Sequence, residues 1–241
     1  MKSPIAHHLC KEMLSAGIDA LYCLPGVQND DFFNALVDHP ALRPFVTRHE
    51  QACSYMAAGA ALSTGKPQAY CTVPGQGVLN AAAGHSTAYA TSARVLALVG
   101  QNKSDYIGKM HGMLHELPDQ TSVLSQISKH AAPLRSAESA GAEIGAAFAA
   151  LSAGRPAPVT IECPLDLWRA ETSPAAGAPA APAVDTDAID RAAELLAGAR
   201  RPLIVLGGGA HDAAAALAIL AARLGAPVSA LRQGKGAYDE R

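Results

Sequence analysis

A carboxylate with polar neighbours stands between two apolar segments near residue 50. The stretch Val46-Thr47-Arg48-His49-Glu50-Gln51-Ala52-Cys53 passes from a β-branched run directly into an Ala-rich helical pattern. In an α/β protein, a junction at the carboxyl end of a strand lines the ligand crevice. Glu50 is therefore a candidate for proton transfer or ligand binding. The same carboxylate could instead only complement the dipole of the helix that it begins, so this stretch leaves both interpretations open.

Two glycine-containing turns occupy similar junctions. Pro74-Gly75-Gln76-Gly77 follows an apolar run and precedes a helix that carries an amide, Asn80, one turn inside it. Gly207-Gly208-Gly209 has the same setting, in which backbone N–H groups can bind phosphate. A G-x-G-x-x-G spacing fails there, because its last position falls on Asp212, whose carboxylate would oppose a pyrophosphate. A tight turn is favoured, with a nucleotide-binding module as the alternative.

A pair of histidines lies in a long segment without clear periodicity, which is either functional or mobile. His111 and His115 have the i, i+4 spacing that places two ligands on one helix face, and Glu116 follows them. Gly112 and Pro118 argue against a helix here. We therefore assign no metal ligands in the chain.

The composition narrows the classes of partner. The 241 residues are 49% hydrophobic and 17% charged, with a net charge of -2 and scattered basic residues, so no surface for nucleic acid is expected. The five cysteines include no C-x-x-C pair, which favours a reducing cytoplasm over a disulfide framework or structural zinc. No apolar run reaches the roughly 18 residues of a membrane span. We expect a cytoplasmic protein without a membrane partner.

Short apolar strands alternate with helices through the first two thirds of the chain. This alternation predicts right-handed crossovers and an α/β fold, with a doubly wound, mostly parallel sheet and helices on both faces. Ser3 is expected to cap the first helix and Asn29 the second. The predicted strands are 20–24, 44–47, 68–73, 95–99 and 157–162, and the predicted helices include 50–63, 77–89 and 136–151.

An Ala/Pro-rich stretch predicts a linker at residues 169–186, between a domain at 1–168 and a second one at 187–241. The second part has a helix at 189–196, a strand at 202–206, a helix at 213–224 and a strand at 227–230. Two strands and two helices leave most of their apolar surface in water. We therefore expect an incomplete Rossmann-like α/β domain, either a fragment or completed by another chain.

Three motifs, taken together, resemble the pyrimidine-binding domain of thiamine-diphosphate enzymes of the acetolactate synthase-like group. They are Leu24-Pro25-Gly26, Arg48-His49-Glu50-Gln51-Ala52 and Gly75-Gln76-Gly77-Val78-Leu79-Asn80. The resemblance covers residues 1 to about 168. It continues through 201–209 and 225–237, which look like the first half of the central domain of that family.

The resemblance implies a chemical role for Glu50. In such enzymes the matching glutamate hydrogen-bonds N1′ of the aminopyrimidine and drives it to the imino tautomer, so that the 4′-imine removes the proton from C2 of the thiazolium. The resulting ylide attacks the carbonyl of a 2-oxo acid. The cofactor carries the electron-sink chemistry, and the protein supplies orientation and this proton relay.

The same resemblance assigns the other site residues. It implies cofactor contacts from Pro25, Gly26, Val27, Glu50, Val73, Gln76 and Asn80, and it places Gln28 and His115 on the substrate side. Simple 2-oxo acid decarboxylases carry an acid at the position of Val27 and paired histidines near His115, so that activity is disfavoured. Gln76 also replaces the middle Pro of the usual Gly-Pro-Gly of the family.

One part of the family pattern is missing from these 241 residues. Family members hold Mg²⁺ and the diphosphate with a Gly-Asp-Gly motif and a downstream Asn in another domain. The resemblance thus implies a site completed by a missing domain or by a partner chain, in a homodimer or with a second polypeptide. The resulting hypothesis is the N-terminal portion of a carboligase or decarboxylase, a transferase or lyase acting on small 2-oxo acids. The alternative is a truncated, non-catalytic paralogue that keeps the oligomerisation face.

Overall fold

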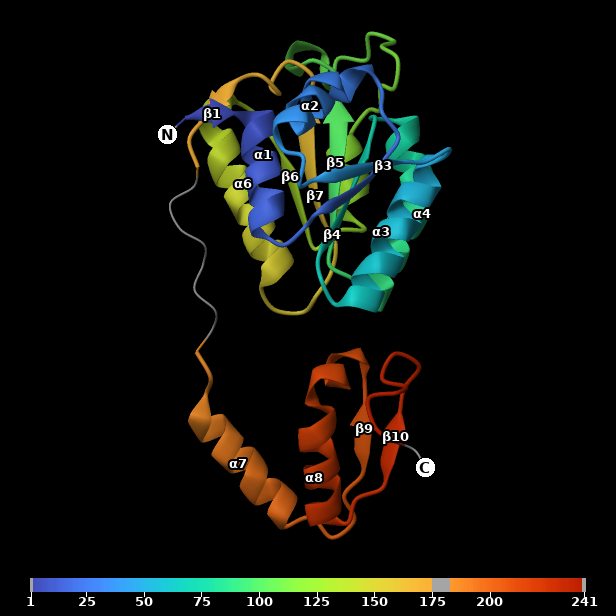
Figure 1. The fold of residues 1–241 in the computed structure, drawn as a ribbon, viewed down its shortest axis with the longest axis vertical. Coiled ribbons are helices and arrows are strands. Elements are labelled where there is room, and N and C mark those ends of the chain that lie inside the picture. The colour runs from blue at the N-terminus through green and yellow to red at the C-terminus, as the bar shows by residue number, and fades with distance from the viewer. Residues whose placement is uncertain (1, 175–182, 240–241) are drawn as a thin grey trace. The chain divides into compact units, whose positions relative to one another are not determined.

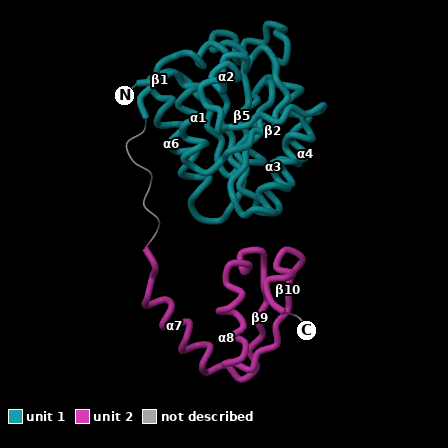
Figure 2. The backbone as a smooth tube through the Cα atoms, viewed as in Figure 1, with its two compact units in different colours: residues 1–180 teal, residues 181–241 magenta. Residues whose placement is uncertain are grey.

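The computed structural model describes residues 2–174 and 183–239, which fall into two compact units, 1–180 and 181–241 (Figure 2). The middle of the expected linker, residues 175–182, lies outside the described residues. Its first residues include a short strand, β8 (Glu171–Thr172), which pairs antiparallel with β1 (Ser3–Pro4). This pairing joins the end of the first unit to its beginning.

A six-stranded sheet forms the centre of the first unit. Its order is β3-β2-β4-β5-β7-β6 and every neighbouring pair is parallel. The strands are β2 (Ala20–Cys23), β3 (Arg43–Val46), β4 (Gln68–Thr72), β5 (Val95–Gln101), β6 (His130–Pro133) and β7 (Val159–Pro164). All residues of β4, β5 and β7 are buried, as expected for a parallel sheet covered on both faces. The predicted α/β fold class is confirmed.

Helices cover both faces of this sheet (Figure 1). On one face, α1 (Ile5–Ser15), α2 (Asp30–Ala35) and α6 (Ala137–Ser152) pack against Leu96 and Leu98 of β5. On the other face, α3 (Glu50–Thr64), α4 (Gln76–Thr91) and α5 (Gln120–Ser125) pack against Val95, Ala97 and Val99. This alternation along β5 follows from the two-residue period of a strand. The described residues of this unit also form three short 3-10 segments: η1 (Val27–Asn29), η2 (Leu36–Asp38) and η3 (Ser104–Tyr106).

Two predicted helix caps are wrong. Ser3 lies in β1, and α1 begins after Pro4 without a side-chain cap, because β8 pairs with the residues that would otherwise start the helix. Asn29 precedes α2, but its side chain does not cap that helix. The Asn29 amide instead donates to the carbonyl of Thr72 at 2.8 Å, which ties the segment after β2 to the end of β4.

Residues 183–239, the described part of the second unit, form two parallel strands and two α-helices. They are α7 (Thr186–Ala197), β9 (Ile204–Leu206), α8 (Ala214–Leu224) and β10 (Val228–Ala230), with a 3-10 segment, η4 (Gly208–Ala213), before α8. Among the described residues of this unit, Leu206, Ala221 and Ala237 are the buried hydrophobic ones. Within the parts of the chain that the structure describes, no helix is both long and apolar enough to cross a membrane.

Candidate functional site

Three turns leave the same edge of the sheet, because β3, β2 and β4 are parallel neighbours. Cys23 of β2 lies level with Val46 of β3 and with Cys71 of β4. The ladder continues one residue further, with the Thr47 N–H donating to Cys23 at 2.9 Å and the Leu24 N–H donating to Cys71 at 3.2 Å. The turns that carry Pro25, Glu50 and Gln76 therefore begin side by side.

Glu50 is the first residue of α3 and is half-buried. The residue before it, His49, is extended and caps the helix through its ring, whose Nδ1 accepts from the N–H of Gln51 at 3.1 Å. Glu50 Oε2 accepts a hydrogen bond from the side-chain amide of Asn80 on α4 at 3.0 Å. No group among the described residues hydrogen-bonds Oε1, which leaves this oxygen available to a ligand. The structure thus brings together two residues, Glu50 and Asn80, that lie 30 positions apart.

Close packing shapes the two turns that follow β2 and β4, next to the Glu50 turn. A Cβ on Gly26 would lie 2.4 Å from Cγ1 of Val73, and a Cβ on Gly77 would lie 2.7 Å from its Cγ2. Val73 is therefore buried beneath both turns and supports them. Gly75 has φ 58° and ψ −112°, and a Cβ there would lie 2.4 Å from the backbone oxygen of His115. Only glycine fits at this point of the turn.

His115 reaches the same turn as a side chain. Its Nδ1 lies 2.8 Å from Oε1 of Gln76, and its backbone φ is +66°. His111 lies in an irregular loop, as Gly112 and Pro118 predict. Desolvation opposes ionisation of Glu116, but the N–H groups of Met113, His111 and Gly112 hold the pKa of Glu116 below its usual range. Across residues 2–174 and 183–239, no group of three or more His, Cys, Asp or Glu side chains is arranged to hold a metal ion.

Of the other two predicted site residues, Val27 lies on the surface and Gln28 in the interior. Val27 is 71% exposed, so its side chain is free to contact a ligand. Gln28 is buried, and its backbone carbonyl accepts from the indole N–H of Trp168 at 2.7 Å. The structure does not bring Gln28 to the exposed part of this edge.

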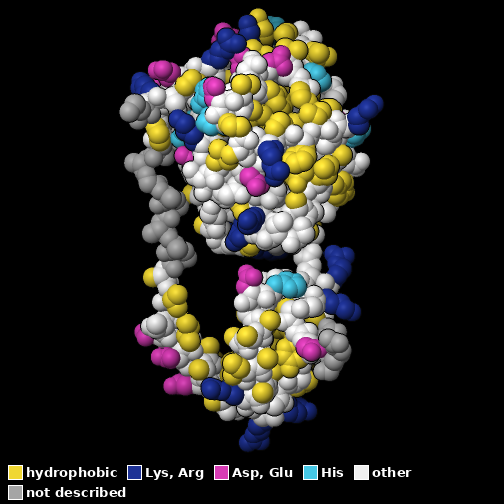
Figure 3. Space-filling model, viewed as in Figure 1, with side chains coloured by type: hydrophobic (Ala, Val, Ile, Leu, Met, Phe, Trp, Pro, Cys, Tyr) yellow, Lys and Arg dark blue, Asp and Glu magenta, His cyan; other side chains and the backbone are white. Residues whose placement is uncertain are grey.

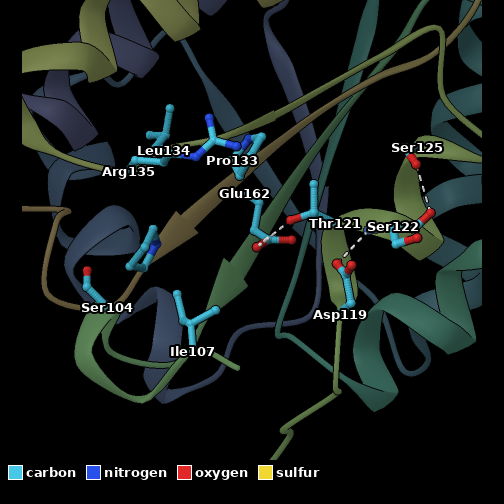
Figure 4. Close-up of a pocket in the computed structure, with 11 residues that line it drawn as sticks. Ser104, Ile107, Asp119, Thr121, Ser122, Ser125, Pro133, Leu134, Arg135 and Glu162 are labelled. Atoms are coloured by element: carbon cyan, nitrogen blue, oxygen red, sulfur yellow. Dashed lines mark hydrogen bonds between the residues drawn. The ribbon is translucent and has the colours of Figure 1, made fainter. Parts of the chain in front are cut away.

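A second group of polar side chains, which the sequence did not single out, lies at the carboxyl ends of β5 and β7. Glu162 is 4% exposed and lines a cavity of about 620 Å³ (Figure 4). Its Oε1 accepts from Gln101 and from the Thr121 hydroxyl, both at 3.2 Å, and its Oε2 accepts from Gln120 at 3.0 Å. Burial raises the pKa of Glu162 despite these three donors. A charged residue inside the apolar strand 159–164 was the sequence signal for this group.

Comparisons with known proteins agree with this geometry. The model for the thiamine pyrophosphate enzyme N-terminal TPP binding domain matches residues 4–123, and the model for the central domain of the same enzymes matches residues 189–241. The chain belongs to the thiamine pyrophosphate enzyme family.

Its relatives within this family include a probable 2-ketoarginine decarboxylase of Pseudomonas aeruginosa, 36% identical over 95% of this chain and 42% of that protein. A probable acetolactate synthase large subunit of Methanocaldococcus jannaschii is 31% identical over 98% of this chain and 41% of that protein. The large subunit of acetolactate synthase isozyme 1 of Escherichia coli is 31% identical over 88% and 38% respectively. The chain thus spans about two fifths of the length of these curated relatives.

Proposed function

We propose that this chain supplies the aminopyrimidine half of a thiamine diphosphate site, in an enzyme that acts on small 2-oxo acids. The observation that carries the proposal is the Glu50 carboxylate. It stands half-buried at the carboxyl edge of the sheet, with one oxygen fixed by Asn80 and the other without a partner among the described residues. A carboxylate that only complemented a helix dipole would need no such partner from a second helix.

The residues around Glu50 fit an aromatic heterocycle. Glu50 Oε1 would bind and exchange a proton with the pyrimidine nitrogen, and Asn80 would keep the carboxylate turned toward it. Pro25, Gly26 and Val27 would contact the rings, since their turn begins level with that of Glu50. When bound, thiamine diphosphate supplies the electron-sink chemistry at the carbonyl of the 2-oxo acid.

Gln76, in the turn that follows β4, is proposed to face the cofactor. His115, which contacts the same turn, is proposed to face the substrate. Their hydrogen bond of 2.8 Å joins the two residues into one surface. Valine at position 27, where simple decarboxylases carry an acid, favours carboligation or another decarboxylase type. Ligands for Mg²⁺ and the diphosphate are proposed to come from residues outside these 241, either along the same polypeptide or on a partner chain, in a cytoplasmic enzyme.

The partner surface is proposed to be the outer face of α3 and α4. Exposed apolar side chains gather on these two helices (Figure 3): Tyr55, Met56 and Leu62 on α3, and Leu79 and Tyr89 on α4. A Cβ on Gly59, in the same face of α3, would meet nothing within 4 Å, which leaves room for a close helix contact. Exposed apolar patches of this kind mark interaction sites. Because the same helices begin at Glu50 and Gln76, a second copy or a diphosphate-binding chain docked there would close the site.

The proposal is tested by titrating thiamine diphosphate and Mg²⁺ into this chain assembled with a diphosphate-binding domain of the same family. We expect binding that requires the added domain and weakens strongly in Glu50→Gln. A second readout is the exchange of the cofactor C2 proton with solvent, which we expect Glu50→Gln to slow by about 10²- to 10⁴-fold, the usual contribution of an acid–base group.

Glu138→Gln is the matched control, because Glu138 occupies the first turn of α6 as Glu50 does in α3. A pure helix-dipole role would make the two substitutions equivalent. Equal binding and exchange in wild type and Glu50→Gln would refute the proposal and favour a non-catalytic interaction protein.

A further inference from the structure

A buried amide joins the Gly75 turn to the carboxylate of Glu162. The Gly75 N–H donates to Oε1 of Gln120 at 2.7 Å. The Gln120 side-chain NH₂ group donates to Oε2 of Glu162 at 3.0 Å and to the carbonyl of Gly100 at 3.1 Å. Gln120 is 2% exposed, so these three bonds satisfy a side chain that water scarcely reaches.

The bond to Gln120 is the hydrogen bond that the Gly75 N–H donates, and it acts beside the packing of Val73 and His115 on this turn. The left-handed φ of 58° at Gly75 is open to glycine, which loses more conformational freedom on folding than any other residue. The helix that follows, α4, begins at Gln76 without a side-chain cap. The bond to Gln120 therefore holds the backbone at the point where α4 starts.

Glu162 and the Gly100 carbonyl together fix which way round the Gln120 amide lies. An ionised carboxylate only accepts hydrogen bonds, so the NH₂ end of the amide must face Glu162. The oxygen end then faces the opposite way, toward the Gly75 N–H. Gln101 and Thr121 occupy the other oxygen of Glu162, which keeps Oε2 directed at Gln120.

We propose that Gln120, oriented by Glu162, is a positioning residue that sets the geometry of the Gly75 turn and of the start of α4. This rests on the proposed function, since the turn carries Gln76 and leads to Asn80, the partner of Glu50. The relay crosses from β7 past β5 to the end of β4. It connects the half of the sheet that carries no predicted cofactor contact to the half that carries them.

The relay is tested in the chain as it is by hydrogen exchange of individual backbone amides, measured by NMR. In Gln120→Leu we expect the protection of the Gly75 amide to fall at least tenfold, with amides of β5 and β7 unchanged within twofold. Gln101→Leu is the matched control, because it removes a buried amide from the same carboxylate without touching Gly75, while the Thr121 hydroxyl still holds Oε1 of Glu162. Unchanged protection of Gly75 in Gln120→Leu, or an equal loss in both variants, would overturn the proposal.

Gln120→Glu gives a second readout that simple loss of packing would not produce. The introduced carboxyl group still offers an acceptor to Gly75, but at high pH two carboxylates oppose each other, whereas at low pH they can share one proton. We expect the protection of Gly75, corrected for intrinsic exchange, to return toward the wild-type value as pH falls. Asp119 and Arg135, which line the same cavity, are present in both proteins and cancel in the comparison. Protection independent of pH would contradict the orienting role of Glu162.

The link to the cofactor is tested separately in the assembly with a diphosphate-binding domain. Gln120→Leu should weaken thiamine diphosphate binding about tenfold, and Gln101→Leu should leave it within twofold. Unchanged affinity in Gln120→Leu, with Gly75 deprotected, would overturn the positioning role. If the wild-type assembly binds no cofactor, the proposed function fails and the positioning role fails with it, while the amide-exchange experiment still decides whether the hydrogen-bonded relay exists.

Discussion

The two units of the chain share one sequence pattern and differ in burial. Each has apolar strands followed by a glycine-containing turn and an Ala-rich helix. In the first unit, β4, β5 and β7 are buried throughout, whereas in β9 and β10 of the second unit only Leu206 is buried. Large apolar side chains of the second unit stay exposed, among them Leu195 and Ile219. The sequence pattern therefore specifies a strand, a turn and a helix. Whether the turn becomes part of a functional site depends on the elements that pack around it.

The two glycine turns show the same contrast locally. Gly75 is held by Gln120 and is in contact with the backbone of His115. A Cβ on Gly209 would meet nothing within 4 Å, and the chain passes into η4 before α8 begins at Ala214. The phosphate sites of dinucleotide-binding turns use the free N–H groups of an α-helix directly after the turn. The tight-turn interpretation of Gly207-Gly208-Gly209 is therefore favoured over a nucleotide site.

The largest expected difference between the units is independent folding. Residues 2–174 alone, which retain β8, should unfold cooperatively, with a midpoint within a few degrees of the first transition of the whole chain. Residues 183–241 alone should show no cooperative transition, because so small a buried core rarely offsets the conformational entropy lost on folding. Circular dichroism melts of the two fragments measure this. A cooperative transition of the isolated second fragment would contradict the comparison.

A matched pair of truncations sharpens the contrast at single residues. Leu98 is fully buried in β5 and Ile219 is 58% exposed on α8. Leu98→Ala should lower the free energy of unfolding by about 2–5 kcal/mol, since it removes buried methyl groups and leaves a cavity. Ile219→Ala should change it by no more than about 0.5 kcal/mol, as is usual for exposed positions. Urea unfolding measures both values, and equal effects would show that the face of α8 is covered in solution.

The sequence predicted most elements of the first sheet, because buried parallel strands appear as short apolar runs between helices. It missed β6, whose four residues include only two alanines between His130 and Pro133, a run too short and weak to register. The cap assigned to Ser3 was wrong because the pairing of β1 with β8 depends on a segment more than 160 residues away, which no local pattern reveals.

The candidate site also has one part that the sequence predicted and one part that it did not. Chain order alone places the Pro25, Glu50 and Gln76 turns at the ends of parallel strands, so their shared edge followed from the sequence. The contacts of Gln120 did not, because they join α5 to β7 and to the turn after β4 across the sheet. Only the carboxylate at Glu162 in an apolar strand hinted at that network.

Acid should destabilise the first unit through His85. His85 is a residue of α4, and its ring is fully buried between the Tyr70 hydroxyl at 3.1 Å and the Ser128 hydroxyl at 2.8 Å. Burial lowers the pKa of His85 to about 4. Below pH 6.5, His85 therefore takes up a proton in the unfolded chain, whereas in the folded chain it stays neutral until the pH falls to about 4. The resulting loss in the free energy of unfolding is roughly 2 kcal/mol between pH 7 and pH 5.

The measurement is urea unfolding at the two pH values in wild type and in His85→Gln, which keeps a donor and an acceptor for its neighbours. We expect the pH dependence of the variant to be weaker by that amount. Glu162 acts in the opposite direction, since its raised pKa favours the folded state at low pH, and it is common to both proteins. His211→Gln, at an exposed position of the second unit, is the control and should leave the dependence unchanged. The same dependence in His85→Gln and wild type would refute the assignment.

The last comparison between the units concerns two glycines, one inside a helix and one at the end of a helix. A Cβ on Gly84 of α4 would lie 2.3 Å from the Ser54 hydroxyl and 2.7 Å from the backbone nitrogen of Tyr55 on α3. Gly84→Ala should therefore cost about 1–3 kcal/mol, because a helix backbone and not a flexible side chain must give way.

Gly198, at the end of α7, has an ordinary φ of −83°, and its added Cβ would come no closer than 3.7 Å to a carbonyl oxygen. Gly198→Ala should leave stability unchanged or raise it by up to about 1 kcal/mol, through the lower entropy of the unfolded chain. Thermal unfolding of the two variants compares them directly. A loss at Gly198 as large as that at Gly84 would mean that α7 packs against a surface as close as the one between α3 and α4. The contrast between a covered and an uncovered unit would then no longer hold.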